Sequence, residues 1–213
     1  MLNVAPPILI SRILTLIIAF TIHEYSHALV ATYYGDETPR NAGRLTLNPL
    51  AHLDVIGSLL LLIAGFGWAK PVPINPLVLK QRSRFATMWV SLAGPLSNLC
   101  MAILAAIPIR LGLVARIPSG AILPSLYVFL INFLGINLLL MLFNLIPLAP
   151  LDGEKVVEII FPSSLGEWYQ KLRPYGPLLL LALVFVLPRF GVDIIGQYLQ
   201  TATGTLIHLF LGV

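Results

Sequence analysis

Residues 8–34 read ILISRILTLIIAFTIHEYSHALVATYY, and this stretch decides how the rest of the chain is interpreted. A helix that crosses a bilayer needs about 20 consecutive, mostly apolar residues, so the stretch is long enough to span a membrane. It nevertheless contains His23, Glu24 and His27. Ionisable side chains are costly at membrane depth and usually mark functional sites there. The stretch therefore predicts a transmembrane helix that carries a functional site.

The composition of the whole chain agrees with a membrane location. Hydrophobic residues make up 58% of its 213 residues and charged residues 10%, whereas soluble domains carry about 25% charged residues. Further apolar stretches lie at roughly 52–66, 85–113, 122–148, 176–188 and 194–213. These features exclude an ordinary soluble domain, and we expect membrane lipid but no nucleic acid as a partner. The single Cys100 excludes an internal disulfide and any metal site built from several thiolates.

The apolar stretches predict an all-α polytopic membrane protein with about five transmembrane helices. The stretch 52–66 has 15 residues. As a helix it would be about 22 Å long, too short for a hydrocarbon core about 30 Å thick, so we expect it to be re-entrant. The connection 67–84 has three prolines within residues 71–76, which predicts extended or looped backbone, a short hairpin or loop near the functional site. We expect one membrane-embedded domain over residues 1–213, with a core at about 8–155 and C-terminal helices at 176–213.

Residues 23–27, His-Glu-Tyr-Ser-His, form an H-E-x-x-H motif. Positions four apart lie on one face of a helix, so the imidazoles of His23 and His27 can bind the same metal ion. The carboxylate of Glu24 lies beside them and can accept a proton from a water molecule during hydrolysis. The alternative is a pair of structural histidines packed against a neighbouring helix, which the apolar surroundings of the motif disfavour.

A hydrolytic zinc site usually has three protein ligands, so a third one is needed. His52, in a polar connection, and His208, in the last apolar stretch, are poor candidates by position. Asp152 follows the long apolar stretch 122–148, where two prolines and a glycine break the helix and can turn a carboxylate sideways. Spacing alone leaves an ordinary turn aspartate equally possible.

Residues 23–27 and the N-x-x-P-x-x-x-L-D-G pattern at 144–153 resemble the two signature motifs of the site-2 protease family, the intramembrane metalloproteases. Residues 94–98, Gly-Pro-Leu-Ser-Asn, are similar to the G-P-x-x-N element of that family, and residues 48–54 and 67–73 extend the likeness. The resemblance covers roughly residues 10–155, with the motifs in order and in matching hydrophobic contexts. The resemblance is to a compact member of the family, without the PDZ or CBS domain that is attached in many relatives.

The resemblance implies one zinc ion per chain, bound by His23, His27 and Asp152, with Glu24 as the general base. It also implies that Asn98 and Asn144 handle substrate near the metal, and Asn144 could donate a hydrogen bond to the developing oxyanion. For Asn98 the alternative is a hydrogen bond between helices. The implied substrate is a single-span membrane protein, cut within or near its transmembrane segment in regulated intramembrane proteolysis.

Residues 68–76, which we call the proline-rich segment, offer a second way to bind such a substrate. An unwound substrate could pair with this extended backbone by strand addition, which makes Trp68, Val72 and Ile74 candidate substrate-binding residues. The alternative is a plain connecting loop. Two other functions stay open for the whole chain: a membrane metal-ion transporter, which would need a polar path to both faces, and a non-catalytic zinc-binding membrane protein, which would not require Glu24.

The site also constrains the topology. His23 lies nearer the C-terminal end of its span and Asp152 follows the C-terminal end of another, so the two helices must run in the same direction. One crossing, at 85–113, then separates them. With this parity, nine Lys and Arg residues fall on one side of the membrane and four on the other. Because cytoplasmic loops carry an excess of Lys and Arg, we expect the site toward the cytoplasmic side. The expected location is a prokaryotic cell membrane, which the protein crosses several times. The nine are Arg40, Arg44, Lys70, Lys80, Arg82, Arg84, Lys155, Lys171 and Arg173, and the four are Arg12, Arg110, Arg116 and Arg189.

Overall fold

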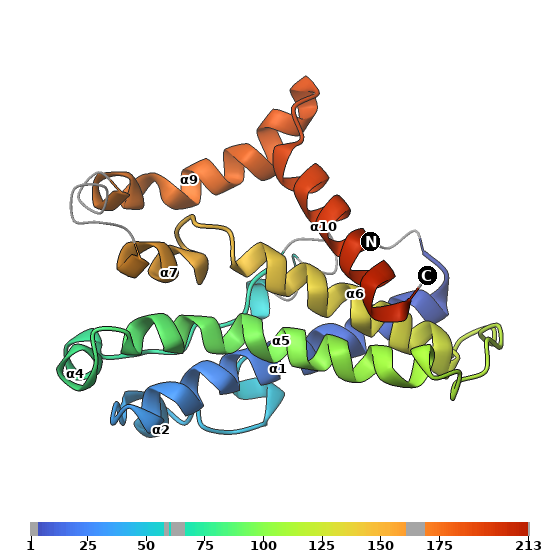
Figure 1. The fold of residues 1–213 in the computed structure, drawn as a ribbon, viewed down its shortest axis with the longest axis horizontal. Coiled ribbons are helices and arrows are strands. Elements are labelled where there is room, and N and C mark those ends of the chain that lie inside the picture. Colours follow the sequence, from blue (N-terminus) through green and yellow to red (C-terminus); the bar gives the residue numbers. More distant parts are fainter. Residues whose placement is uncertain (1–3, 58–59, 61–66, 161–168, 213) are drawn as a thin grey trace.

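Three long helices form the centre of the molecule. The computed structural model describes residues 4–57, 60, 67–160 and 169–212. In it, α1 (Pro6–Tyr33), α5 (Ala86–Arg110) and α6 (Leu126–Asn144) pack against one another. Figure 1 shows α1 and α6 running in the same direction, with α5 antiparallel to both. The parity predicted from the sequence is therefore confirmed.

Shorter helices connect and cover these three. The longest of them, α10, packs against both α5 and α6. A loop connects α6 to α7, and irregular turns connect α9 to α10 (Figure 1). The elements are α2 (Thr38–Asn41), η1 (Pro49–Ala51), α4 (Pro76–Arg82), α7 (Gly153–Ile160), η2 (Arg173–Tyr175), α9 (Gly176–Leu181), η3 (Ala182–Val186), η4 (Leu187–Phe190) and α10 (Ile194–Leu211).

The main core lies between α5 and α6. Ala102, Ala105 and Ala106 of α5 are buried in one cluster with Leu134 and Leu138 of α6, and side chains of α10 pack against that cluster. Small residues at such a contact let two helix backbones approach closely, which favours packing inside a membrane. This close approach fixes α5 and α6 as a frame for the polar side chains farther along both helices.

Four helices are long and apolar enough to cross a membrane: Pro6–Tyr33, Ala86–Arg110, Leu126–Asn144 and Tyr169–Phe190. The prediction of an all-α polytopic membrane protein is confirmed, although the described part of the chain has four such helices where the sequence predicted about five. The difference is α10, because Gln197, Gln200 and several threonines make it too polar. The span expected at 176–188 begins earlier, at Tyr169, and it passes through a π-helical turn at Ala182–Val186.

The predicted re-entrant stretch 52–66 lies partly outside the described residues, at 58–59 and 61–66. Its flanks lie side by side, since Leu53 and Ala69 form an antiparallel bridge and the Lys70 amide donates to the His52 carbonyl at 2.7 Å. Residues 70–75 form no helix, as their prolines predicted. The extended prediction for 67–84 was wrong at Pro76–Arg82, which form α4. Proline is favoured at the first position of a helix, and the Asn75 side chain caps this one.

Candidate metal centre and its cavity

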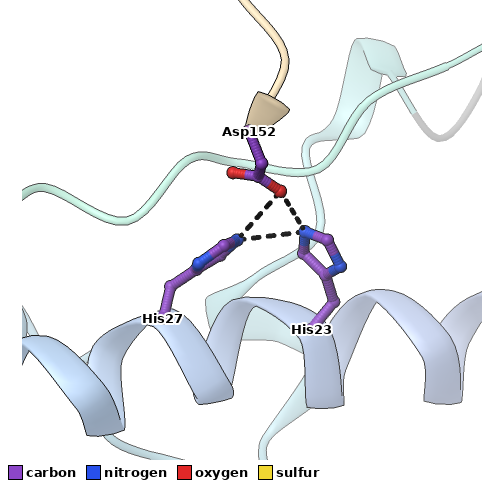
Figure 2. A group of neighbouring side chains, drawn as sticks. All are labelled: His23, His27 and Asp152. Atoms are coloured by element: carbon purple, nitrogen blue, oxygen red, sulfur yellow. Dashed lines mark hydrogen bonds and ion pairs between the residues drawn. The ribbon is translucent and has the colours of Figure 1, made fainter. Parts of the chain in front are cut away.

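Three side chains far apart in the sequence converge on one point. His23 and His27 project from one face of α1, and Asp152 reaches down between them from the turn before α7 (Figure 2). The two Nε2 atoms are 3.0 Å apart, and Asp152 Oδ2 lies 3.2 Å from the His23 Nε2 and 3.4 Å from the His27 Nε2. The spacing of His23 and His27 predicted their shared face, and the structure adds Asp152 to them.

These distances fit a tetrahedral metal ion. Zinc–nitrogen and zinc–oxygen bonds of about 2.0–2.2 Å put neighbouring ligand atoms of a tetrahedron about 3.3–3.6 Å apart. The three atoms observed here are 3.0–3.4 Å apart, close to that spacing. Two imidazole nitrogens and one carboxylate oxygen also form a donor set that zinc accepts, with a fourth position left over. The three residues could therefore hold a zinc ion.

The protons on the two imidazoles point away from this centre. His23 Nδ1 lies 2.6 Å from Asn98 Oδ1, and His27 Nδ1 lies 2.6 Å from the Val90 carbonyl oxygen. Both partners are acceptors, so each Nδ1 carries the hydrogen and each Nε2 presents a lone pair. Two lone pairs and a carboxylate oxygen then face one another in a buried space. Such a cluster repels itself unless a cation lies at its centre, which supports a metal site.

The loop after α6 positions Asp152. Its backbone folds back so tightly over the end of the helix that a Cβ on Gly153 would lie 2.4 Å from the Leu145 carbonyl oxygen. This turn brings Asp152 Oδ2 within 3.4 Å of both Nε2 atoms, and the ionised carboxylate is the form that binds metals.

Helix α5 packs against the two imidazoles at Gly94. A Cβ on Gly94 would lie 2.4 Å from His27 Nε2 and 2.5 Å from His23 Nε2. Only glycine leaves room for both nitrogens at this position. Glu24, which follows His23 on α1, is buried with 8% of its surface exposed and lines the same cavity.

A cavity of about 420 Å³ opens in front of the three ligand candidates. Trp68, Val72, Ile74 and Asn144 line it, together with apolar side chains of α1, α6 and α9. Asn144 is the last residue of α6, and its side-chain NH₂ donates to the Leu140 carbonyl at 3.0 Å. The predicted substrate-binding residues of the proline-rich segment and the predicted oxyanion donor therefore share one cavity with Glu24 and Asp152.

Asn98 lies elsewhere. It is fully buried behind His23 and makes the inter-helix hydrogen bond that the sequence held open as its alternative. Sequence reasoning missed its partner on α6, Asn137, which is also fully buried and accepts a hydrogen bond from Asn98 Nδ2 at 2.9 Å. A signal for Asn137 was available, because it is an uncharged polar residue in the middle of an apolar span.

Two buried charges hold the proline-rich segment in place. The guanidinium of Arg44, 3% exposed, donates to the carbonyl oxygens of Ala51 and Lys70. At the other end of the segment, Asp36 Oδ2 accepts from the Asn75 amide at 2.6 Å. No sequence pattern indicated these contacts, since Arg44 had entered only as a charge on one side of the membrane.

An all-α membrane fold, with two histidines of a spanning helix and one aspartate of a loop at a candidate metal centre, defines a polytopic membrane metalloprotein. A Bacillus subtilis protein named "Putative zinc metalloprotease YwhC" is 38% identical over 202 residues, which cover 94% of this chain and 91% of that protein. Proteins named "Putative zinc metalloprotease Rip2" from Mycolicibacterium smegmatis and Mycobacterium tuberculosis are 34% and 32% identical, over 79% and 82% of this chain and 64% of each relative. No family model and no solved structure matches. The chain belongs to the site-2 protease family of zinc metalloproteases.

Proposed function

We propose that the chain is an intramembrane endopeptidase that hydrolyses peptide bonds within or near the transmembrane segments of single-span membrane proteins. One observation carries this proposal: the candidate ligands and Glu24 lie on or beside a helix apolar enough to span a bilayer, buried at a largely apolar cavity. A peptide bond that reaches this centre must enter surroundings that suit a membrane segment. Regulated intramembrane proteolysis is the process that such an activity serves.

Five polar residues at the cavity have a role in this proposal. His23, His27 and Asp152 would hold one zinc ion per chain, which would supply Lewis-acid chemistry that polarises a carbonyl group and activates water. Glu24 accepts the proton of the attacking water and then returns it to the leaving amine. Asn144 uses a side-chain N–H hydrogen to stabilise the developing oxyanion, since its amide has two hydrogens and Leu140 takes one of them.

The activity can be tested with purified protein in lipid vesicles and a single-span model substrate. We expect cleavage that a zinc chelator abolishes and added zinc restores. Helical carbonyls are engaged in i→i−4 bonds, so the substrate must unwind before attack. A substrate with Gly, Asn or Pro near the cut should therefore be cleaved much faster than an all-Leu version that binds equally well. Cleavage that persists in chelator, or an all-Leu substrate cut just as fast, would count against the proposal.

The proline-rich segment, which Arg44 and Asp36 hold at its two ends, is suited to bind an unwound substrate. Val72 and Ile74 are two residues apart in a helix-free segment that continues from the bridge at Ala69. In a strand, the N–H and C=O groups of such residues face one edge, here the edge on which Lys70 pairs with His52. Among the described residues nothing bonds the backbone groups of Val72 or Ile74. An extended substrate can add there as a strand, while Trp68 contributes apolar contact at the same cavity.

Replacing Val72 by Pro should slow cleavage about tenfold, because it removes one backbone donor from a substrate that has no water nearby to replace it. Val72→Ala keeps the N–H and serves as the matched control, which should stay close to the parent. The measurement is the initial cleavage rate with the Gly-containing substrate. Equal rates for the Pro and Ala variants would show that this amide does not bind substrate.

We further propose that the protein lies in a bacterial cell membrane with the site toward the cytoplasm. The charge count along the chain supports this orientation, and the named relatives are bacterial. Cysteines placed at Asn41 and Arg82, in a Cys100→Ser background, should react with a membrane-impermeant thiol reagent only from the cytoplasmic side. Labelling of the two positions from opposite sides would overturn the proposed topology.

A further inference from the structure

Three consecutive hydrogen bonds connect the backbone of α6 to His23. Asn137 Nδ2 donates to the Phe133 carbonyl oxygen at 2.8 Å, and Asn98 Nδ2 donates to Asn137 Oδ1 at 2.9 Å. Asn98 Oδ1 then accepts from His23 Nδ1 at 2.6 Å. Asn98 and Asn137 are both 0% exposed, so water does not compete for these bonds.

The direction of this relay is fixed at its far end. A backbone carbonyl can only accept, so the NH₂ end of Asn137 must face Phe133 and its oxygen must face Asn98. The Asn137 oxygen accepts a hydrogen bond from the NH₂ end of Asn98, so the oxygen of Asn98 faces His23. The hydrogen of His23 therefore lies on Nδ1, and the lone pair of Nε2 points to the metal centre.

Asn98 cannot fix this arrangement alone, because its amide has an acceptor end and a donor end of nearly the same shape. If the amide turned over, its NH₂ group would face His23 Nδ1 and favour the tautomer with hydrogen on Nε2. In that tautomer Nε2, the nitrogen that faces the metal centre, has no lone pair with which to bind a metal. We propose that Asn137 is a positioning residue that sets the tautomer of His23 through Asn98 and thereby the zinc affinity of the site. The proposal rests on the zinc site of the proposed function.

The test compares zinc affinity, measured by competition with a chelator, in the full-length purified protein. Loss of a partner behind a metal-binding histidine typically weakens metal affinity about 10–100-fold, and we expect this loss for Asn137→Leu. Asn132→Leu is the matched control: Asn132 lies on the same helix and also donates to a carbonyl four residues back, Val128, at 2.8 Å, outside the relay. It should bind zinc as the parent does. If Asn137→Leu does not fold, Asn137→Ala carries the same expectation.

A second variant separates the relay from general packing. Asn98→Leu removes the middle residue of the relay, so it should itself weaken zinc binding about 10–100-fold and leave Asn137 with no connection to His23. In this background Asn137→Leu should change zinc affinity by no more than about twofold, the scatter expected between independent sites. The visible spectrum of bound Co²⁺ should report the same pattern: perturbed in Asn137→Leu and unperturbed in Asn132→Leu.

Two results would overturn the proposal: parent-like zinc affinity in Asn137→Leu, or a loss from Asn137→Leu that is equally large with and without the Asn98→Leu substitution. Failure of the proposed function looks different, because the parent protein would then bind no zinc or would bind it without cleaving any membrane substrate.

Discussion

Glu24→Gln is expected to keep its zinc and to lose peptide-bond hydrolysis by about 10²–10⁴-fold, the contribution of a general base. Glutamine has nearly the shape of glutamate but cannot accept the proton of the attacking water. Glu24 is buried at the cavity one residue from His23, while the candidate ligand atoms come from His23, His27 and Asp152. The substitution therefore removes a base and leaves every ligand in place.

Two measurements on Glu24→Gln are needed, the zinc content and the single-turnover cleavage rate of a model substrate. Glu37→Gln is a suitable control, because Glu37 is an exposed carboxylate paired with Arg40 outside the cavity. Loss of zinc together with activity would make Glu24 a ligand or a structural residue. Retained activity would remove the general base and favour a non-catalytic zinc protein.

Gly94→Ala is expected to abolish zinc binding, with a loss in affinity of at least about 100-fold, the upper end of what outer-shell changes cause. The added methyl group would lie 2.4–2.5 Å from both Nε2 atoms, where non-bonded atoms cannot remain. The rings cannot simply retreat, because Asn98 and the Val90 carbonyl hold them from behind. We expect the imidazoles to be pushed out of the ligand positions.

The control for this variant is Gly135→Ala on α6. There the nearest atom to a new Cβ is 3.8 Å away, an ordinary contact. Alanine is favoured over glycine in a helix by about 1 kcal/mol, so this variant should fold and bind zinc like the parent. Zinc stoichiometry and thermal unfolding of the two variants, measured side by side, check the prediction. If Gly94→Ala binds zinc as tightly as Gly135→Ala, the packing of α5 against the two rings is not what the distances indicate.

The local part of the site was predictable from the sequence. The spacing of His23 and His27 fixes their common helical face, and the surrounding residues make the helix long and apolar enough to cross a membrane. Asp152 was different, since spacing alone left it equally open as a turn residue. Its place depends on α6 running parallel to α1 and on a loop that folds back onto the helix end.

The remaining features depend on contacts between distant segments, which no local pattern encodes. Asn98 and Asn137 read as two separate polar residues in apolar spans, and only the packing of α5 on α6 makes them neighbours. Arg44 entered the sequence analysis only as one charge in a count and Asp36 did not enter it, yet both are buried and bond to backbone groups of the proline-rich segment. The polarity of α10 was visible in the sequence, and it keeps this helix outside the candidate membrane spans.

The alternation of proline with Val72 and Ile74 also limits how many chains can gather at the cavity. Pro71 and Pro73 have no N–H group, so the edge opposite the one used by Val72 and Ile74 lacks amide donors at those positions. A strand with two usable edges can template an open sheet that grows by adding further chains. Here we expect a stoichiometry of one extended substrate per enzyme. Unwound membrane segments at high density should therefore compete for the cavity and should not assemble on it.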